Sequence, residues 1–134
     1  MSGLSGKVAV ITGAGQGIGR TYARAYAEAG ISPVIVDIEK DKIDSVRREI
    51  KRDIGLDCLA LRADITNQED IEDVIEKSID RHGRIDILIN NAALFSSLTA
   101  CPALDISTEE WRRVMDVNIT GQFICAKSVL PHMI

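Results

Sequence analysis

A glycine-rich segment, residues 12–19, lies between the apolar run 8–11 and a helix-like stretch, and it constrains the fold more than any other feature. The order strand, tight turn, helix is typical of an α/β unit. A turn this tight uses backbone angles that a Cβ forbids. The start of the helix offers free N–H groups and a positive dipole end to a phosphate. The segment therefore favours nucleotide binding over an ordinary tight turn, which is the alternative.

The spacing of the glycines narrows the type of loop. They fit the pattern G-x-x-x-G-x-G, whereas neither G-x-G-x-x-G nor the Walker A pattern fits. A glycine-rich loop of this kind lets a pyrophosphate approach the main chain closely. The cofactor contacts predicted in this loop are Gly13, Gln16, Gly17 and Ile18.

Asp37 follows the second apolar run, 33–36, and lies twenty residues after Gly17. An acidic residue at about that distance is expected to accept hydrogen bonds from the adenosine ribose hydroxyls. Its charge would repel a 2′-phosphate, and the positions that could favour one hold the neutral residues Gln16 and Ile38. We therefore predict NAD in preference to NADP. The alternative is that Asp37 only caps the next helix.

Length and composition exclude several classes of protein. The 134 residues suffice for one domain with a core. A net charge of −4 without a basic stripe argues against nucleic acid, and no apolar run approaches the roughly 18 residues of a transmembrane helix. Residues 1–7 lack the apolar part of a signal peptide. The three cysteines are widely spaced, so we expect reduced thiols in a cytoplasmic protein and no metal site.

Strand-like and helix-like segments alternate along the rest of the chain. Helices are predicted at 17–29 and 40–54, and strands at 58–63 and 85–89. Two capping boxes, Thr66 with Glu69 and Ser107 with Glu110, predict two further helices, the last ended or kinked at Pro131. This order predicts an α/β, Rossmann-type doubly wound parallel sheet with strand order 3-2-1-4 and a ligand at the switch point.

The fourth predicted strand, 85–89, is apolar almost without interruption. That pattern is typical of a strand with neighbours on both sides and helices on both faces. As the last strand of the chain it would be an exposed sheet edge. We therefore expect the sheet to be incomplete and the chain to be the first part of a longer protein.

Five motifs occur in a fixed order along the chain. They are Thr12-Gly13-x-x-x-Gly17-x-Gly19, Asp37, Asp64-Ile65, Asn90-Asn91-Ala92-Ala93 and Asn118. In this order and spacing they resemble the N-terminal part of the short-chain dehydrogenase/reductase family, and the resemblance covers essentially the whole chain. One position departs from the family pattern: Ala93 stands where the family has glycine, which narrows the space beside the nicotinamide.

The resemblance implies a role for each motif. It implies that the Asp64 carboxylate and the Ile65 N–H contact the adenine, and that Asn91 and Ala92 steady the sheet and lie along the cofactor ribose. It also implies a catalytic role for Asn118, which would hold a water that links the catalytic lysine to solvent. For Asp64 the alternative is an aspartate that merely precedes a helix cap, and for Asn118 it is a structural amide bonded to the backbone.

The chemistry of the family depends on a serine and a Tyr-x-x-x-Lys motif, and neither Tyr22 nor Tyr26 has a lysine four residues on. The resemblance therefore implies that the whole protein is an NAD(H)-dependent oxidoreductase that interconverts an alcohol and a carbonyl. Residues 1–134 would be its NAD-binding part, inactive alone. The alternative is a non-catalytic dinucleotide-binding or regulatory module. The helix from Ser107 is apolar on more than one side, so we also expect a homotetramer or homodimer.

Overall fold

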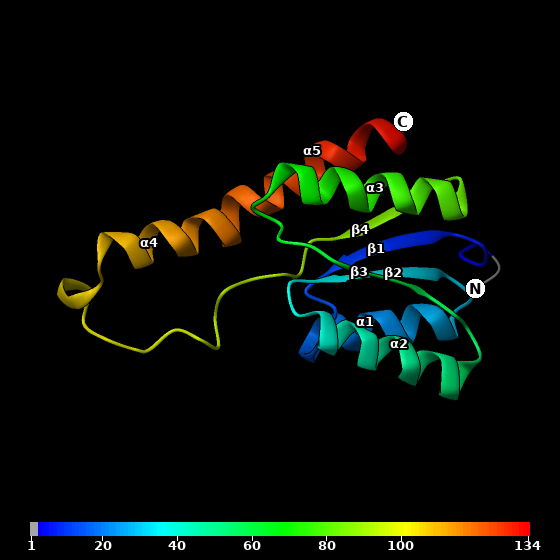
Figure 1. Cartoon of the computed structure of the whole chain (residues 1–134), viewed down its shortest axis with the longest axis horizontal. Helices are drawn as coiled ribbons and strands as arrows, with labels where there is room; N and C mark the ends of the chain where they lie inside the picture. The colour runs from blue at the N-terminus through cyan, green and yellow to red at the C-terminus, as the bar shows by residue number, and fades with distance from the viewer. Residues whose placement is uncertain (1–2) are drawn as a thin grey trace.

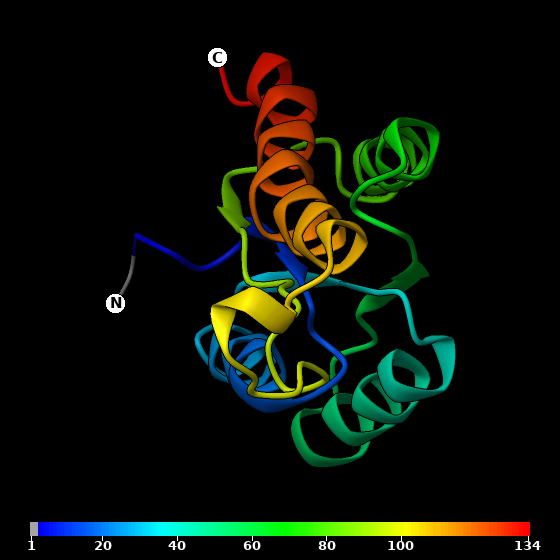
Figure 2. The same cartoon turned by 90° about the vertical axis from the view of Figure 1, so that its left-hand side faces the viewer.

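Two layers of helices enclose a four-stranded parallel sheet in the computed structural model, which describes residues 3–134 (Figures 1 and 2). Residues 1 and 2, part of the N-terminal segment considered above, lie outside the described residues. The sheet order is β3-β2-β1-β4, so the predicted order is confirmed. The strands are β1 (Val8–Thr12), β2 (Ser32–Asp37), β3 (Leu59–Arg62) and β4 (Ile87–Ile89).

The helices separate onto the two faces of this sheet. Helices α1 (Gly17–Glu28) and α2 (Lys40–Ile54) cover one face, and α3 (Gln68–His82) and α5 (Gln122–Val129) cover the other (Figures 1 and 2). A short 3₁₀ turn η1 (Ala103–Asp105) precedes α4 (Thr108–Met115), which extends away from the sheet (Figure 1). The loop after β4 thus crosses the end of the sheet before the chain returns along α4 and α5.

The apolar residues of the central strands divide between two cores. Ala9 and Ile11 of β1 pack toward α1 and α2, whereas Val8 and Val10 pack toward α3 and α5. Successive side chains of a strand point to opposite faces, so a strand covered on both faces must be apolar at every position. All five residues of β1 are buried, which explains the uninterrupted apolar run in the sequence.

One predicted capping box is confirmed and the other is wrong. Ser107 Oγ accepts a hydrogen bond from the Glu110 N–H at 3.1 Å, as expected. At α3 the N-cap residue is Asn67, whose Oδ1 accepts from the N–H groups of Glu69 and Asp70 at 2.9 and 3.2 Å. Thr66 lies one residue before this cap, and its hydroxyl and its N–H both donate to Asp64, two residues earlier.

The predicted long helix after Ser107 is not α-helical throughout. Between α4 and α5 it contains a π-helical segment, η2 (Asp116–Gly121), which the sequence did not reveal. Such segments occur frequently at functional sites. The α-helix ends at Val129, and the 3₁₀ turn η3 (Leu130–His132) contains Pro131, which confirms the expected effect of this proline.

Candidate functional site

The predicted site residues gather where the strands end. Thr12 lies beside Val36 and Ile11 beside Ile89, so the carboxyl ends of β1, β2 and β4 lie together at one end of the sheet (Figure 1). In open α/β sheets, ligands bind at the carboxyl ends of the strands, at the point where the strand order reverses. Here that point lies between β1 and β4, directly after Thr12.

The glycine loop has a conformation in which a Cβ would be strained or would collide with neighbouring atoms. Gly13 and Gly17 have φ of +65° and +55°, which only glycine adopts readily. A Cβ on Gly19 would stand 2.2 Å from the Gly13 carbonyl oxygen and 2.6 Å from Asn91 Nδ2. The loop is therefore closed tightly against the start of α1.

The same loop is open toward solvent at its tip. No atom lies within 4 Å of the point where a Cβ on Gly17 would stand, and the neighbouring Ile18 is 68% exposed. Gln16 is the N-cap residue of α1, and within residues 3–134 its side chain makes no cap hydrogen bond. The first N–H groups of α1 therefore lack the partner that Asn67 gives to α3. An uncapped helix start beside an open glycine tip is suited to a phosphate.

Asp37 joins the glycine loop to the start of α2. Its Oδ2 accepts from the Gly15 N–H and its Oδ1 from the Glu39 N–H, both at 3.0 Å. The carboxylate thus binds the backbone at the start of α2, because Glu39 is the N-cap residue of that helix. This agrees in part with the alternative that Asp37 caps α2. Each carboxylate oxygen carries two acceptor sites, so both can also accept from ribose hydroxyls.

Lys42 is a site residue that the sequence analysis missed. Its Nζ donates to Gln16 Oε1 at 2.8 Å and to Glu39 Oε2 at 2.5 Å, on the same side of the loop as Asp37. Gln16 and Lys42 are 26 residues apart, so no short motif connects them. The available signal was a lysine in the first turn of the helix that follows Asp37.

A buried hydroxyl holds the ends of β1 and β4 together. Thr12 is 1% exposed, and its Oγ1 donates to the Ile89 carbonyl at 3.3 Å and accepts from the N–H groups of Asn91 and Ala92 at 3.1 Å. Asn91 Nδ2 donates in return to the carbonyls of Thr12 and Gly13, each at 3.1 Å. The predicted cofactor residues Gly13, Asn91 and Ala92 therefore form one bonded unit.

The π-helical segment and α5 fix the loop after β4. Asn118 pairs with the backbone of Leu94, accepting from its N–H at 2.7 Å and donating to its carbonyl at 3.0 Å. Gln122 Nε2 donates to the Ala92 carbonyl at 2.5 Å. The amide of Asn118 is thus bonded as the structural alternative predicted, and its role in holding a water stays a prediction.

Asp64 and Ile65 lie beside the end of β2. The Ala63 N–H donates to the Asp37 carbonyl at 3.0 Å, which ties the segment that follows β3 to the end of β2. Asp64 Oδ1 accepts from the N–H and the hydroxyl of Thr66, just before the N-cap residue Asn67, so Asp64 precedes a helix cap as the alternative stated. The Ile65 side chain is buried against Gly121 of η2. The adenine contacts of both residues stay predictions.

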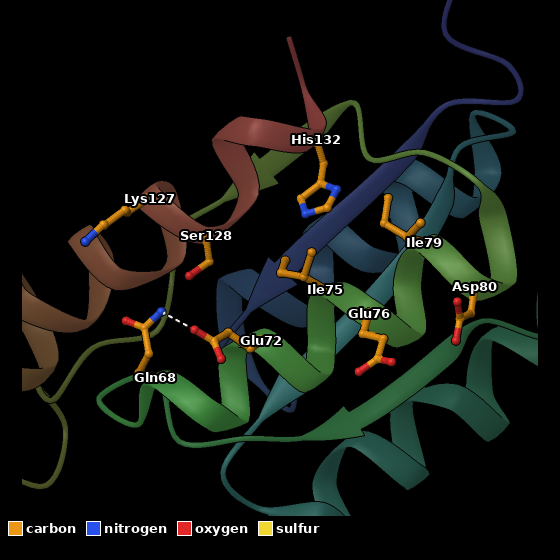
Figure 3. A pocket seen from close by; sticks show the side chains of 9 residues that line it. All are labelled: Gln68, Glu72, Ile75, Glu76, Ile79, Asp80, Lys127, Ser128 and His132. Carbon is orange, nitrogen blue, oxygen red and sulfur yellow. Dashed lines mark hydrogen bonds between the residues drawn. The ribbon is translucent and has the colours of Figure 1, made fainter.

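A groove of about 430 Å³ between α3 and α5 contains none of these residues (Figure 3). Ile75 and Ile79 line it from α3, together with the carboxylates Glu72, Glu76 and Asp80 (Figure 3). The groove lies in the helix layer opposite α1 and α2, so it is separate from the glycine loop.

Three other features of the described residues concern metal ions, membranes and cysteine thiols. Within residues 3–134, no three histidine, cysteine or acidic side chains come together to hold a metal ion, and no helix is long and apolar enough to cross a membrane. Burial raises the pKa of the thiols of Cys58 and Cys125 to about 11, so neither is a ready nucleophile.

Comparison with known proteins gives the same assignment as the motifs. The family model described as short chain dehydrogenase matches residues 7–134. An uncharacterized oxidoreductase of Thermotoga maritima is 37% identical over 98% of this chain and 50% of its own length. Sorbitol dehydrogenase of Cereibacter sphaeroides is also 37% identical, over 98% of this chain and 48% of its own.

Solved structures agree with these relatives. A short-chain type dehydrogenase/reductase from Mycobacterium marinum superimposes with a TM-score of 0.90 at 35% identity, over 97% of this chain and 51% of its own. The 3-ketoacyl-(acyl-carrier-protein) reductase of Brucella melitensis, solved in complex with NADH, gives 0.88 at 36% identity, over 96% and 51%. The chain thus spans about half the length of the relatives it matches, and it corresponds to their N-terminal part. Because the family model matches nearly the whole chain, the chain belongs to the short-chain dehydrogenase family.

Proposed function

We propose that the full-length protein is an NAD(H)-dependent oxidoreductase that interconverts an alcohol and a carbonyl, and that residues 1–134 hold its cofactor. When bound, the nicotinamide supplies the hydride acceptor or donor. The observation that carries the proposal is the uncapped start of α1 beside the open tip at Gly17. Those N–H groups and the helix dipole would hold the pyrophosphate, with Gly13, Gln16 and Ile18 around it.

The adenosine end of the cofactor would lie along the ends of β2 and β3. Asp37 would accept from the ribose hydroxyls, and its negative charge supports a preference for NAD(H) over NADP(H). Asp64 and the Ile65 N–H would contact the adenine, since the backbone bond between Ala63 and Asp37 brings them beside the ribose position.

The nicotinamide end would lie toward the loop after β4. Asn91 and Ala92 would follow the second ribose, held there by the hydroxyl of Thr12. Asn118 would act further along, near the reacting groups, by holding a water that connects the catalytic lysine to solvent. That lysine and its tyrosine would come from the part of the protein beyond residue 134.

Two measurements on the full-length protein test this proposal. Titration with NAD⁺ and NADP⁺ should show tighter binding of NAD⁺, and the double substitution Asp37→Ala with Ile38→Arg should move the preference toward NADP⁺. Unchanged relative affinities in the double variant would refute the role of Asp37. Following NADH absorbance with a panel of alcohols and ketones should show turnover. Dinucleotide binding without any turnover would favour the non-catalytic module instead.

We also propose that a second copy of the protein covers the exposed side of the continuous helical segment formed by α4, η2 and α5. Four large apolar side chains recur there at intervals of four residues and are exposed. They are Trp111, Met115, Ile119 and Phe123. An apolar face of this length needs a covering surface, which supports the expected homodimer or homotetramer.

A cytoplasmic location is the last part of the proposal. Cys58, Cys101 and Cys125 are all free thiols, and Cys101 is exposed. Free exposed thiols are typical of a reducing compartment. Cell fractionation tests this, since recovery of the protein outside the cytoplasm would contradict it.

A further inference from the structure

Lys42 crosses from α2 onto the glycine loop. Its Nζ is 2.8 Å from Gln16 Oε1 and 2.5 Å from Glu39 Oε2. The point where a Cβ on Gly15 would stand is 2.8 Å from Lys42 Cβ and 2.9 Å from Asp37 Oδ2. The Lys42 Cβ and the Asp37 carboxylate thus both lie close to Gly15, at the same edge of the glycine loop.

The charges around this edge are arranged so that one cation faces two carboxylates. Asp37 and Glu39 each carry a negative charge, and Lys42 carries the positive one. Arg62 is the register partner of Asp37 on β3, but its Nη1 lies 4.0 Å from Asp70 Oδ2, on the side of α3. Lys42 is therefore the cation placed to act at the ribose edge.

An ammonium group has three N–H donors, and Gln16 and Glu39 engage two of them. The third remains for an anion at the ribose. The side chain is also 38% exposed, so it can move toward a ligand without leaving a buried pocket. A phosphate on the ribose 2′-oxygen would meet the Asp37 carboxylate and the Lys42 ammonium together.

We propose that Lys42 is a specificity-determining residue that favours a 2′-phosphate, and that its effect is masked by the charge of Asp37. The inference rests on the proposed dinucleotide function. It follows that neutralising Asp37 alone lets the site accept a 2′-phosphate, without any added arginine. Replacing Lys42 as well abolishes this gain in affinity for a 2′-phosphate, because the charge that then remains at this edge is the negative charge of Glu39.

The test compares two probes that differ only in the 2′-phosphate, 5′-AMP and 2′,5′-ADP. Their affinities are measured by titration calorimetry on the full-length protein and on Asp37→Asn, Asp37→Asn/Lys42→Met and Asp37→Asn/Lys40→Met. Asparagine keeps an acceptor for the loop, and Asp37→Ser serves as a second neutral variant if the asparagine protein does not fold. Lys40 is the matched control, because it stands on the same helical turn but pairs with Asp44.

Asp37→Asn should bind 2′,5′-ADP, and adding Lys42→Met should weaken that binding roughly tenfold or more, as expected for a charge-assisted contact. The Lys40→Met change should alter it less than about twofold, as for a solvated surface pair. Affinity for 5′-AMP should fall when Asp37 is replaced, because that carboxylate would accept from the ribose hydroxyls, and it should not change further when Lys42 or Lys40 is replaced in addition.

The opposing results are distinct. If 5′-AMP binds but 2′,5′-ADP binds equally well with and without Lys42, the inference about Lys42 is wrong and the dinucleotide site stands. An equal loss on changing Lys40 and Lys42 would also overturn it, since the effect would then be general surface charge. If the wild-type protein binds neither 5′-AMP nor NAD⁺, the proposed function fails and the inference fails with it.

Discussion

Thr12→Val should destabilise the protein and loosen the site although it preserves the shape of the side chain. The Thr12 hydroxyl is buried and accepts from the N–H groups of Asn91 and Ala92. Valine leaves both half-buried N–H groups without this acceptor, beside a side chain that is itself buried. An unsatisfied donor costs about 1–3 kcal/mol when buried, and because these two N–H groups are only half-buried we expect the lower part of that range for each, a total loss of about 2–4 kcal/mol in the free energy of unfolding.

Thr12→Ser is the matched control for this variant. Serine keeps the hydroxyl and removes one buried methyl group, which should cost only about 1 kcal/mol. Urea unfolding at a fixed protein concentration compares the two variants, and NAD⁺ titration reports whether Asn91 and Ala92 still hold their places. If Thr12→Val is no less stable than Thr12→Ser and binds NAD⁺ equally well, the hydroxyl network does not organise the site.

Three further predictions concern the glycine loop, Asp86, whose Oδ2 accepts from the Val8 N–H at the start of β1, and the exposed helix face. Gly19→Ala should abolish NAD⁺ binding, because the new Cβ would stand 2.2 Å from the Gly13 carbonyl oxygen; retained affinity in a titration would contradict the loop geometry. The Arg84 hydrogen bond lowers the pKa of Asp86 from 3.8 to about 2, so its stabilisation is present above about pH 4 and lost as the pH falls toward 2. Acid unfolding of Asp86→Asn should therefore lack a pH-dependent contribution of about 1–2 kcal/mol, and an unchanged acid profile would argue against it. Phe123→Glu should lower the mass of the full-length protein in light scattering, whereas a strictly monomeric wild type at micromolar concentration would refute the assembly.

The sequence predicted the order of elements, and placed the candidate site residues at the ends of the strands, for a clear reason. An apolar run buried on both faces, such as Val8–Ile11, has a simple pattern, and the alternation of such runs with amphipathic helices permits few topologies. The glycine spacing and Asp37 then marked the ends of β1 and β2. These features depend on local sequence, and the structure agrees with them.

Features that depend on competition between neighbours were not predictable in this way. Thr66 and Asn67 could each have capped α3; in the structure Asn67 does so, and Thr66 donates to Asp64 instead. The π-helical segment around Asn118 has no simple sequence pattern. The bond between Lys42 and Gln16 requires the fold to bring the first turn of α2 over the loop, so it could be found only in the structure.

Clusters of hydrogen bonds also changed the interpretation of single residues. The Asn91 amide holds the carbonyls of Thr12 and Gly13, which fits the role of steadying the sheet that the resemblance implied, and its place along the cofactor ribose stays a prediction. Asn118 is similar, because both ends of its amide bind Leu94. Residues of this kind position a site, and a substitution at either one should therefore reduce stability and cofactor affinity together.

A crystal structure of the full-length protein with NAD⁺ tests the proposed cofactor site most directly. We expect the pyrophosphate oxygens at hydrogen-bond distance from the N–H groups of Ile18 and Gly19, and the adenosine ribose hydroxyls on Asp37. NAD⁺ bound elsewhere, for example in the groove between α3 and α5, would contradict the proposed site. So would a glycine loop that stays empty at saturating NAD⁺.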